Sequence, residues 1–218
     1  CFKTDSKYKD VLLPNLSGID LNNNPKLDET RWIINFKDWE IEKAKKYEIC
    51  FKRVQDLVFP FRQKNSKKDL KTNWWLYERY RKKMYDKIEN KEKVLVRCQT
   101  GKFNTFVFVP NRYVYDQRII VFNIDKYDYY AVLNSCIHES WVYKFAGSVG
   151  GTTINYSPNY LFETFSFPNL FDSNISDSLS SIARILFSSL VELLEDLNIG
   201  LTKIYNLYHL KNLSLDSK

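Results

Sequence analysis

The chain lacks long apolar runs, and among its 218 residues it has only two histidines, four cysteines and one methionine. About 20 consecutive apolar residues are needed for a helix to cross a bilayer, and no signal-peptide pattern opens the sequence. We therefore expect no membrane association. The same features predict a soluble, intracellular protein.

Scarce cysteine and histidine argue against metal and disulfide chemistry. The four cysteines are widely separated: Cys1, Cys50, Cys98 and Cys136. None forms the close C-x-x-C pair of a zinc site, so we expect no metal and buried, reduced thiols. His138 is followed by Glu139, but the residues after them do not complete an H-E-x-x-H motif. We therefore expect His138 to make a structural contact in a helix or core.

Motifs that carry catalysis are also missing. There is no G-x-S-x-G elbow and no Walker loop, and the glycine-rich residues 147–151 follow a predicted helix, whereas phosphate loops follow a strand. Ser157-Pro158-Asn159-Tyr160 departs from the adenine-methyltransferase pattern [DNS]-P-P-[YFW] because its third residue is Asn. The acidic residues Asp116, Asp125 and Asp128 are scattered in predicted turns. We predict that this chain catalyses no reaction.

Aromatic residues are abundant, at 16% of the sequence. Such a composition favours β-rich packing and surfaces that stack on flat partners. Trp32, Trp74, Trp75 and Trp141 each lie among periodic apolar residues, so we expect them in the core.

Hydrophobic periodicity predicts a mixed α+β fold, with a largely antiparallel β core, flanking helices and a small C-terminal helical segment. Strands are predicted at 11–13, 31–36, 94–97, 105–109, 118–122 and 156–168. Helices are predicted at 39–58, stopped by Pro60, after Asn73 as a cap, and at 128–145, 176–197 and 201–210, with a loop at 147–153. The change of character after Pro168 predicts two domains, residues 1–168 and residues 169–218.

The net charge of +7 is concentrated in one segment. Residues 36–93 hold 18 cations against 10 anions, whereas the remainder holds 15 against 16. Within residues 62–83 there are nine cations and two anions. A localised basic stripe indicates a surface for a polyanion, although a solvated helix face with extended lysines gives the same pattern.

Several short elements occur along the chain in a fixed order. They are Gly-Ile-Asp-Leu-Asn at 18–22, Arg-Trp-Ile-Ile-Asn-Phe at 31–36, Glu-Lys-Ala-Lys-Lys-Tyr at 42–47, Trp74-Trp75 with Arg79, residues 95–102, Ser-Cys-Ile-His-Glu-Ser-Trp at 135–141, residues 156–168 and residues 200–209. In this order they resemble the carboxy-terminal part of type IIG restriction-modification enzymes. This group includes the MmeI-like enzymes and the adenine methyltransferases of BREX phage-defence systems.

The resemblance implies a target recognition domain, with residues 1–168 reading a short site in double-stranded DNA. It implies that the parent enzyme is an adenine-N6 methyltransferase, with or without endonuclease activity, in the bacterial cytoplasm. S-adenosylmethionine and Mg²⁺ would then serve methyltransferase and nuclease domains of the same polypeptide, and we expect no cofactor in this chain.

Recognition of this kind needs cations on phosphates and polar side chains on base edges. Two loops resemble the specificity-bearing segments of the family and supply the predicted base-reading residues: Arg97, Gln99, Thr100, Lys102, Asn104, Thr152, Thr153 and Asn155. The basic segment supplies the predicted phosphate-binding residues: Lys64, Lys67, Lys68, Lys71, Arg79, Arg81 and Lys82. The alternative is a non-catalytic subunit of a phage-defence complex whose basic face binds an acidic protein.

Overall fold

The computed structural model describes residues 6–150 and 153–209. Contacts divide the chain into two compact units. Unit 1 comprises Cys1–Asn15, Thr30–Asn90 and Arg112–Val114, and unit 2 comprises Leu16–Glu29, Lys91–Asn111 and Tyr115–Lys218.

Unit 1 is a small sheet with a cluster of short helices. Its sheet has the order β2-β1-β6, and β1 runs antiparallel to β2 with Leu12 opposite Ile34. The elements are a 3-10 helix η1 (Ser6–Asp10), β1 (Leu12–Leu16), β2 (Arg31–Ile34), α2 (Ile41–Lys45), α3 (Glu48–Leu57), α4 (Phe59–Gln63), α5 (Lys68–Thr72), α6 (Lys82–Ile88) and β6 (Val114–Tyr115).

The core of unit 1 is largely aromatic. The ring centroids of Phe51 and Trp74 lie 5.4 Å apart, and Phe36 packs on Phe51. Indole and phenyl rings bury large areas, and tilted pairs bring the positive edge of one ring toward the negative face of the other, so a few side chains hold several short helices together. The buried members are Tyr8, Val11, Phe36, Ala44, Cys50, Phe51 and Trp74.

Three sequence predictions for unit 1 are wrong in detail. The helix predicted at 39–58 is interrupted at Tyr47, whose ψ of 61° is not helical. Pro60 lies in the first turn of α4, where its missing N–H costs nothing, so it starts a helix there. Asn73 ends α5, and its backbone N–H donates to the Asp69 carbonyl. The next helix, α6, begins only at Lys82.

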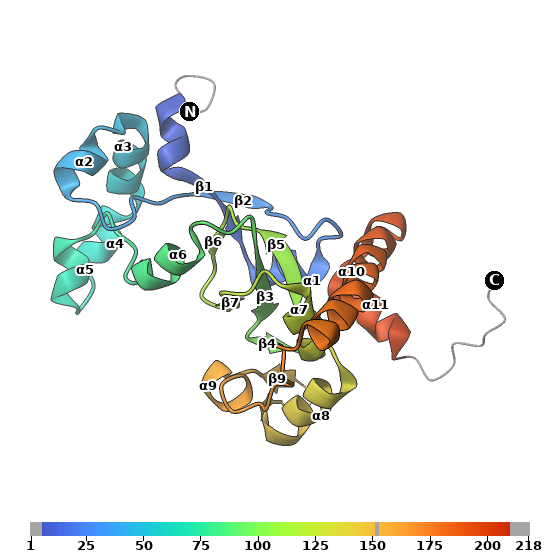
Figure 1. The fold of residues 1–218 in the computed structure, drawn as a ribbon. Coiled ribbons are helices and arrows are strands. Elements are labelled where there is room, and N and C mark those ends of the chain that lie inside the picture. The colour runs from blue at the N-terminus through green and yellow to red at the C-terminus, as the bar shows by residue number, and fades with distance from the viewer. Residues whose placement is uncertain (1–5, 151–152, 210–218) are drawn as a thin grey trace. The chain divides into compact units, whose positions relative to one another are not determined.

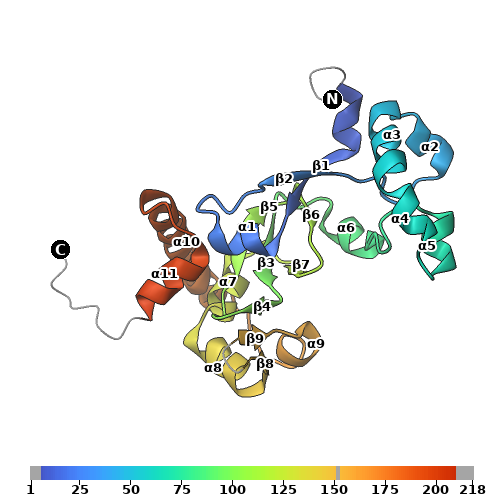
Figure 2. The same cartoon turned by 180° about the vertical axis from the view of Figure 1, so that it is seen from behind.

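Unit 2 is built on a three-stranded antiparallel sheet. Strand β3 (Lys93–Cys98) lies between β5 (Val107–Pro110) and β7 (Ile119–Phe122), and five of its six residues are buried. The long helix α10 (Ser173–Asp196) lies beside α7 (Tyr127–Leu133) (Figure 1). Helix α1 (Gly18–Asn23) packs against β3 (Figure 2).

A second small sheet in unit 2 has the order β4-β9-β8. Its strands are β4 (Thr100–Gly101), β8 (Gly147–Val149) and β9 (Thr153–Asn155). The remaining helices of unit 2 are α8 (Cys136–Phe145), α9 (Pro158–Leu161) and α11 (Leu201–Tyr208).

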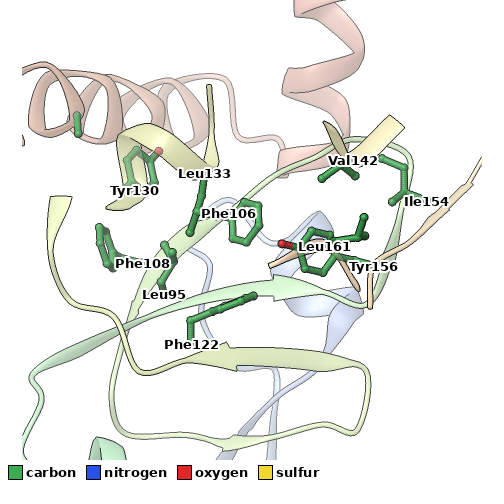
Figure 3. Packing of buried hydrophobic residues seen from close by; sticks show 11 residues of the cluster. Leu95, Phe106, Phe108, Phe122, Tyr130, Leu133, Val142, Ile154, Tyr156 and Leu161 are labelled. Carbon is green, nitrogen blue, oxygen red and sulfur yellow. The ribbon is translucent and has the colours of Figure 1, made fainter. Parts of the chain in front are cut away.

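One core joins the two sheets of unit 2. Leu95 of β3 and Ile154 of β9 belong to the same buried cluster. Phe106 and Tyr156 meet edge to face inside it, with ring centroids 5.6 Å apart (Figure 3). The small sheet is therefore anchored to the interior and is not a free loop.

The strand predicted at 156–168 is wrong. Pro158 opens the short helix α9, because proline fits the first turn of a helix, and the residues after Leu161 are turns and irregular chain. The helix predicted at 128–145 is two helices, since the Ser135 hydroxyl caps a new helix by accepting the His138 backbone N–H. The segment 147–153, predicted as a loop, contains β8 and the start of β9.

The predicted fold class is confirmed: short antiparallel sheets, flanking helices and a C-terminal pair of helices. The domain boundary near residue 169 stays a prediction. In the structure α10 and α11 belong to unit 2 together with β3 and α7. Among residues 6–150 and 153–209, no helix is both long and apolar enough to span a membrane.

Candidate nucleic-acid interface

The two predicted reading loops meet in the small sheet of unit 2. Strand β4 pairs antiparallel with β9, so that Thr100 lies opposite Asn155 and Gly101 opposite Ile154. The ladder continues at its end, where the Tyr156 backbone N–H donates to the Gln99 carbonyl at 2.8 Å. Two segments more than 50 residues apart in the sequence thus become neighbours.

The faces of this sheet differ in polarity. Side chains alternate along a strand, and directly opposite residues share a face. Thr100, Thr153 and Asn155 therefore lie on one face and are half-buried, whereas Ile154 points into the core. Gln99, next to β4, is exposed. The outcome is a small polar surface held on an apolar base. Thr152 lies outside the described residues.

Two predicted base-reading residues are buried, which corrects their assignment. Arg97 is 1% exposed and Asn104 4% exposed. The Arg97 Nη1 donates to Asn104 Oδ1 at 2.6 Å, and Asn104 Nδ2 donates to the Leu133 carbonyl. Side chains that are enclosed and satisfied in this way present no edge to a ligand. They lie on either side of β4 in the sequence and contact each other in the interior.

Lys102 is exposed, but its ammonium group has a partner within the chain. Its Nζ donates to Asn206 Oδ1 of α11 at 2.5 Å. The neighbouring Phe103 ring stacks on His209 with an interplanar angle of 3°. The motif at 200–209 therefore braces the segment that follows β4.

Gly200 permits that close approach. A Cβ built at this position would lie 2.3 Å from the Asn23 Cα and 2.4 Å from the Asn22 carbonyl oxygen. Both are backbone atoms of α1 and its end, so no side chain can move aside. Asn22 also donates to the Cys98 thiol at 3.3 Å, and burial raises the pKa of that thiol to about 11.

The predicted phosphate-binding residues all belong to unit 1 and are all exposed. Lys67 pairs with Glu78 at 2.6 Å, and Lys82 pairs with Asp38 at 2.8 Å. Hydrogen bonds from these two lysines hold the pKa of each carboxyl below its usual value. None of the ion pairs among the described residues includes the other lysines of this set: Lys64, Lys68 and Lys71.

Part of this basic segment surrounds a hollow of about 650 Å³. Its charged lining is almost balanced, with anions placed between the cations. Tyr77 and Tyr80 contribute aromatic surface to the same hollow. The charged residues of the lining are Lys37, Lys67, Lys68, Arg79, Asp38, Asp69 and Glu78. The net positive potential of unit 1 therefore depends on cations outside the hollow as well.

The predictions for the tryptophans and cysteines are confirmed for some residues and wrong for others. Trp74 is buried and Trp75 and Trp141 are partly buried, but Trp32 is 51% exposed, so its core assignment is wrong. Cys50 and Cys98 are buried free thiols, whereas Cys136 is exposed, and Cys1 lies outside the described residues. Among the residues that the structure describes, no group of His, Cys, Asp and Glu is arranged to hold a metal ion.

His138 is a core contact, as predicted. It is fully buried, and burial lowers its pKa to about 4, so the imidazole is neutral at pH 7. Sequence reasoning did not place Tyr156 beside it, although the Tyr156 hydroxyl lies 3.3 Å from His138 Nε2. Alternation from Ile154 places Tyr156 on the core face, but it cannot identify His138 as the partner, because that residue lies 18 positions earlier in helix α8.

The comparison with family models assigns this mixed α+β chain to the target-recognition class of domains. The model of the family "MmeI, target recognition domain" matches residues 3–169, and the chain belongs to this family.

Among solved structures, the chain is similar to the type IIL restriction-modification enzyme MmeI in complex with DNA. The identity is 14% and the TM-score 0.56, over 89% of this chain. The match spans 29% of the length of that enzyme. Comparison with curated proteins gives no match.

Proposed function

We propose that this chain recognises a short sequence in double-stranded DNA and positions catalytic domains that lie outside it. One observation carries the proposal: β4 and β9 place two polar segments, distant in sequence, side by side on one surface. Base reading needs such convergence, because neighbouring base pairs must be contacted from a single rigid support.

In this proposal Gln99 and Asn155 read base edges. Their amides offer a donor and an acceptor together, which matches the N6 and N7 atoms of adenine. Thr100 and Thr153 lie on the same face of the sheet as Asn155 and contact either base type through hydroxyl or methyl groups. Lys102 reads guanine only if its contact with Asn206 is exchanged for one with DNA.

The basic segment of unit 1 binds phosphates. Lys64, Lys68 and Lys71 are exposed, and Arg79 and Arg81 lie on the same segment. Lys67 and Lys82 join them by exchanging a surface carboxylate for a phosphate. An exposed ion pair contributes at most about 1 kcal/mol, so this exchange costs little.

The parent protein, we infer, is a site-specific adenine-N6 DNA methyltransferase, with or without endonuclease activity, in the bacterial cytoplasm. The related enzyme of known structure is a restriction-modification enzyme bound to DNA, which supports this assignment. S-adenosylmethionine and Mg²⁺ would act in methyltransferase and nuclease domains of the same polypeptide. The chain itself would contribute DNA contacts and no catalytic group.

Binding to duplex DNA at several salt concentrations, with a non-specific competitor, tests the proposal. Phosphate contacts release counterions, and the logarithm of the binding constant falls by roughly 0.9 per contact per tenfold rise in salt. We expect a steep salt dependence and a preferred sequence after selection from random duplexes. Weak association that is insensitive to salt would refute the proposal and favour the alternative, a basic face for an acidic protein.

A further inference from the structure

Beneath the small sheet lies a closed set of buried polar contacts. The Arg97 guanidinium donates from Nε to the Cys98 carbonyl at 3.1 Å and from Nη1 to Asn104 Oδ1 at 2.6 Å. Its carbon Cζ lies 3.9 Å from the centre of the Tyr156 ring. The cation is therefore held by a carbonyl, an amide and an aromatic face, all of them neutral.

The contacts continue through one backbone carbonyl. Asn104 Nδ2 lies 3.0 Å from the Leu133 oxygen, and His138 Nδ1 lies 2.9 Å from the same oxygen. A carbonyl only accepts, so donation to Leu133 requires the tautomer with the proton on Nδ1. In that tautomer Nε2 accepts from the Tyr156 hydroxyl at 3.3 Å. The path from Arg97 through Asn104, Leu133 and His138 reaches Tyr156, whose aromatic ring faces Arg97 again. We call this closed path of contacts the buried ring.

Three members of the buried ring, Arg97, Asn104 and Tyr156, flank β4 or β9 in the sequence. Arg97 lies two residues before Gln99, and Asn104 lies three residues after β4. Tyr156 directly follows Asn155, the last residue of β9. A shift of Arg97, Asn104 or Tyr156 therefore moves an end of β4 or β9, and His138 acts on these ends through its contact with Tyr156.

A buried cation without a carboxylate is costly, and that cost needs an explanation. Burial lowers the pKa of Arg97 to about 10, so it still carries its charge at neutral pH. Apolar replacements of buried polar groups are often neutral or stabilising. Retaining this arrangement is better explained by geometry: the planar guanidinium fixes two acceptors and a ring at once, which lysine cannot do.

We propose that Arg97, Asn104, His138 and Tyr156 are positioning residues that set the distance and alignment of the DNA-reading strands β4 and β9. The inference rests on the proposed function. Gln99, Thr100 and Asn155 touch the bases, whereas the buried ring determines where they stand.

Two variants of the full-length protein test this. Arg97→Lys keeps the positive charge but loses the planar guanidinium group. Tyr156→Phe keeps the aromatic ring but loses the hydroxyl that contacts His138 Nε2. The measurement is the ratio of affinities for the selected duplex and a scrambled one, at a temperature where each variant is folded. We expect the ratio to fall about tenfold for Arg97→Lys, since the loss of one hydrogen bond made by a charged group has an effect of this size. Loss of one hydrogen bond predicts about fivefold for Tyr156→Phe.

The control is Leu194→Ala, in the buried face of α10, which lowers stability without touching the ring. This control variant should have the wild-type ratio. Arg97→Lys and Tyr156→Phe should both keep the wild-type affinity for scrambled DNA. A wild-type ratio in Arg97→Lys and Tyr156→Phe would overturn this inference and leave the proposed function standing. If the wild-type protein itself shows no preference, the proposed function fails, and the inference fails with it.

Discussion

The two units hold their candidate DNA contacts in opposite ways. In unit 2, Thr100 and Asn155 face each other across a strand pair whose underside is packed into an apolar core. In unit 1, the cations are long exposed side chains, and two of them pair with carboxylates that are also exposed. Reading a base edge requires fixed geometry, whereas attraction to phosphate tolerates movement. The difference in support thus matches the difference in proposed role.

The largest expected effect is on DNA affinity, and it tests whether the lysines of the basic segment matter more than the net charge of the whole chain. We expect Lys64→Ala, Lys68→Ala and Lys71→Ala together to weaken binding to every duplex by roughly 100-fold or more near physiological salt. The measurement is the salt dependence of binding. A control that removes three exposed lysines of unit 2, Lys26, Lys126 and Lys203, changes the net charge equally and should have a much smaller effect. Equal losses in both triples would end the distinction between the units.

The second prediction concerns pH and the support of unit 2. Burial lowers the pKa of His138 to about 4, below the ordinary value of 6.5. The unfolded chain therefore binds a proton that the folded chain does not, and stability falls as pH drops from about 6.5 toward 4. The limit is about 3 kcal/mol in the free energy of unfolding.

Urea denaturation at pH 7 and pH 4.5 measures this loss. The same experiment on His138→Gln should remove most of the difference between the two pH values. The variant His209→Gln, which changes the other histidine, should retain it. A pH dependence that survives His138→Gln would show that the buried imidazole is not the source.

The third prediction sharpens the contrast at the level of single bases. We expect Gln99→Ala and Asn155→Ala each to relax preference at one base position, by about 1–3 kcal/mol, while affinity for scrambled DNA stays unchanged. Selection from random duplexes detects this as one position that becomes degenerate. Recovery of the wild-type sequence by both variants would remove them from the reading surface.

The smallest effect compares neighbours in unit 1. Lys67 pairs with Glu78, whereas Lys68 is in none of the ion pairs among the described residues. Lys68→Ala should therefore weaken binding more than Lys67→Ala, by less than about 1 kcal/mol. Titration at low salt resolves the difference. If Lys67→Ala binds more weakly than Lys68→Ala, the ion pair with Glu78 does not reduce the contribution of Lys67 to DNA binding.

The sequence predicted the fold class, the strands of the central sheet and the long C-terminal helix, because their apolar periodicity extends over many residues. It misplaced short elements. Asn73 suits either end of a helix by its chemistry, and only the packing of Leu70 shows that the helix lies before it.

The proposed reading surface was predictable only in part. The sequence pointed to the segments around Gln99 and Asn155, but their pairing depends on contacts distant in sequence. Arg97 and Asn104 were misassigned because polarity normally indicates exposure. A local signal did exist: Arg97 follows Val94-Leu95-Val96 inside a strand that reads as continuously apolar, which is typical of a strand covered on both faces.

Photo-crosslinking tests the central claim most directly. A crosslinking amino acid at position 99 or 155 should attach to bases within the selected sequence. The same amino acid at position 68 should attach to selected and scrambled duplexes alike. Tight, sequence-selective binding without any base crosslink from positions 99 and 155 would contradict the account.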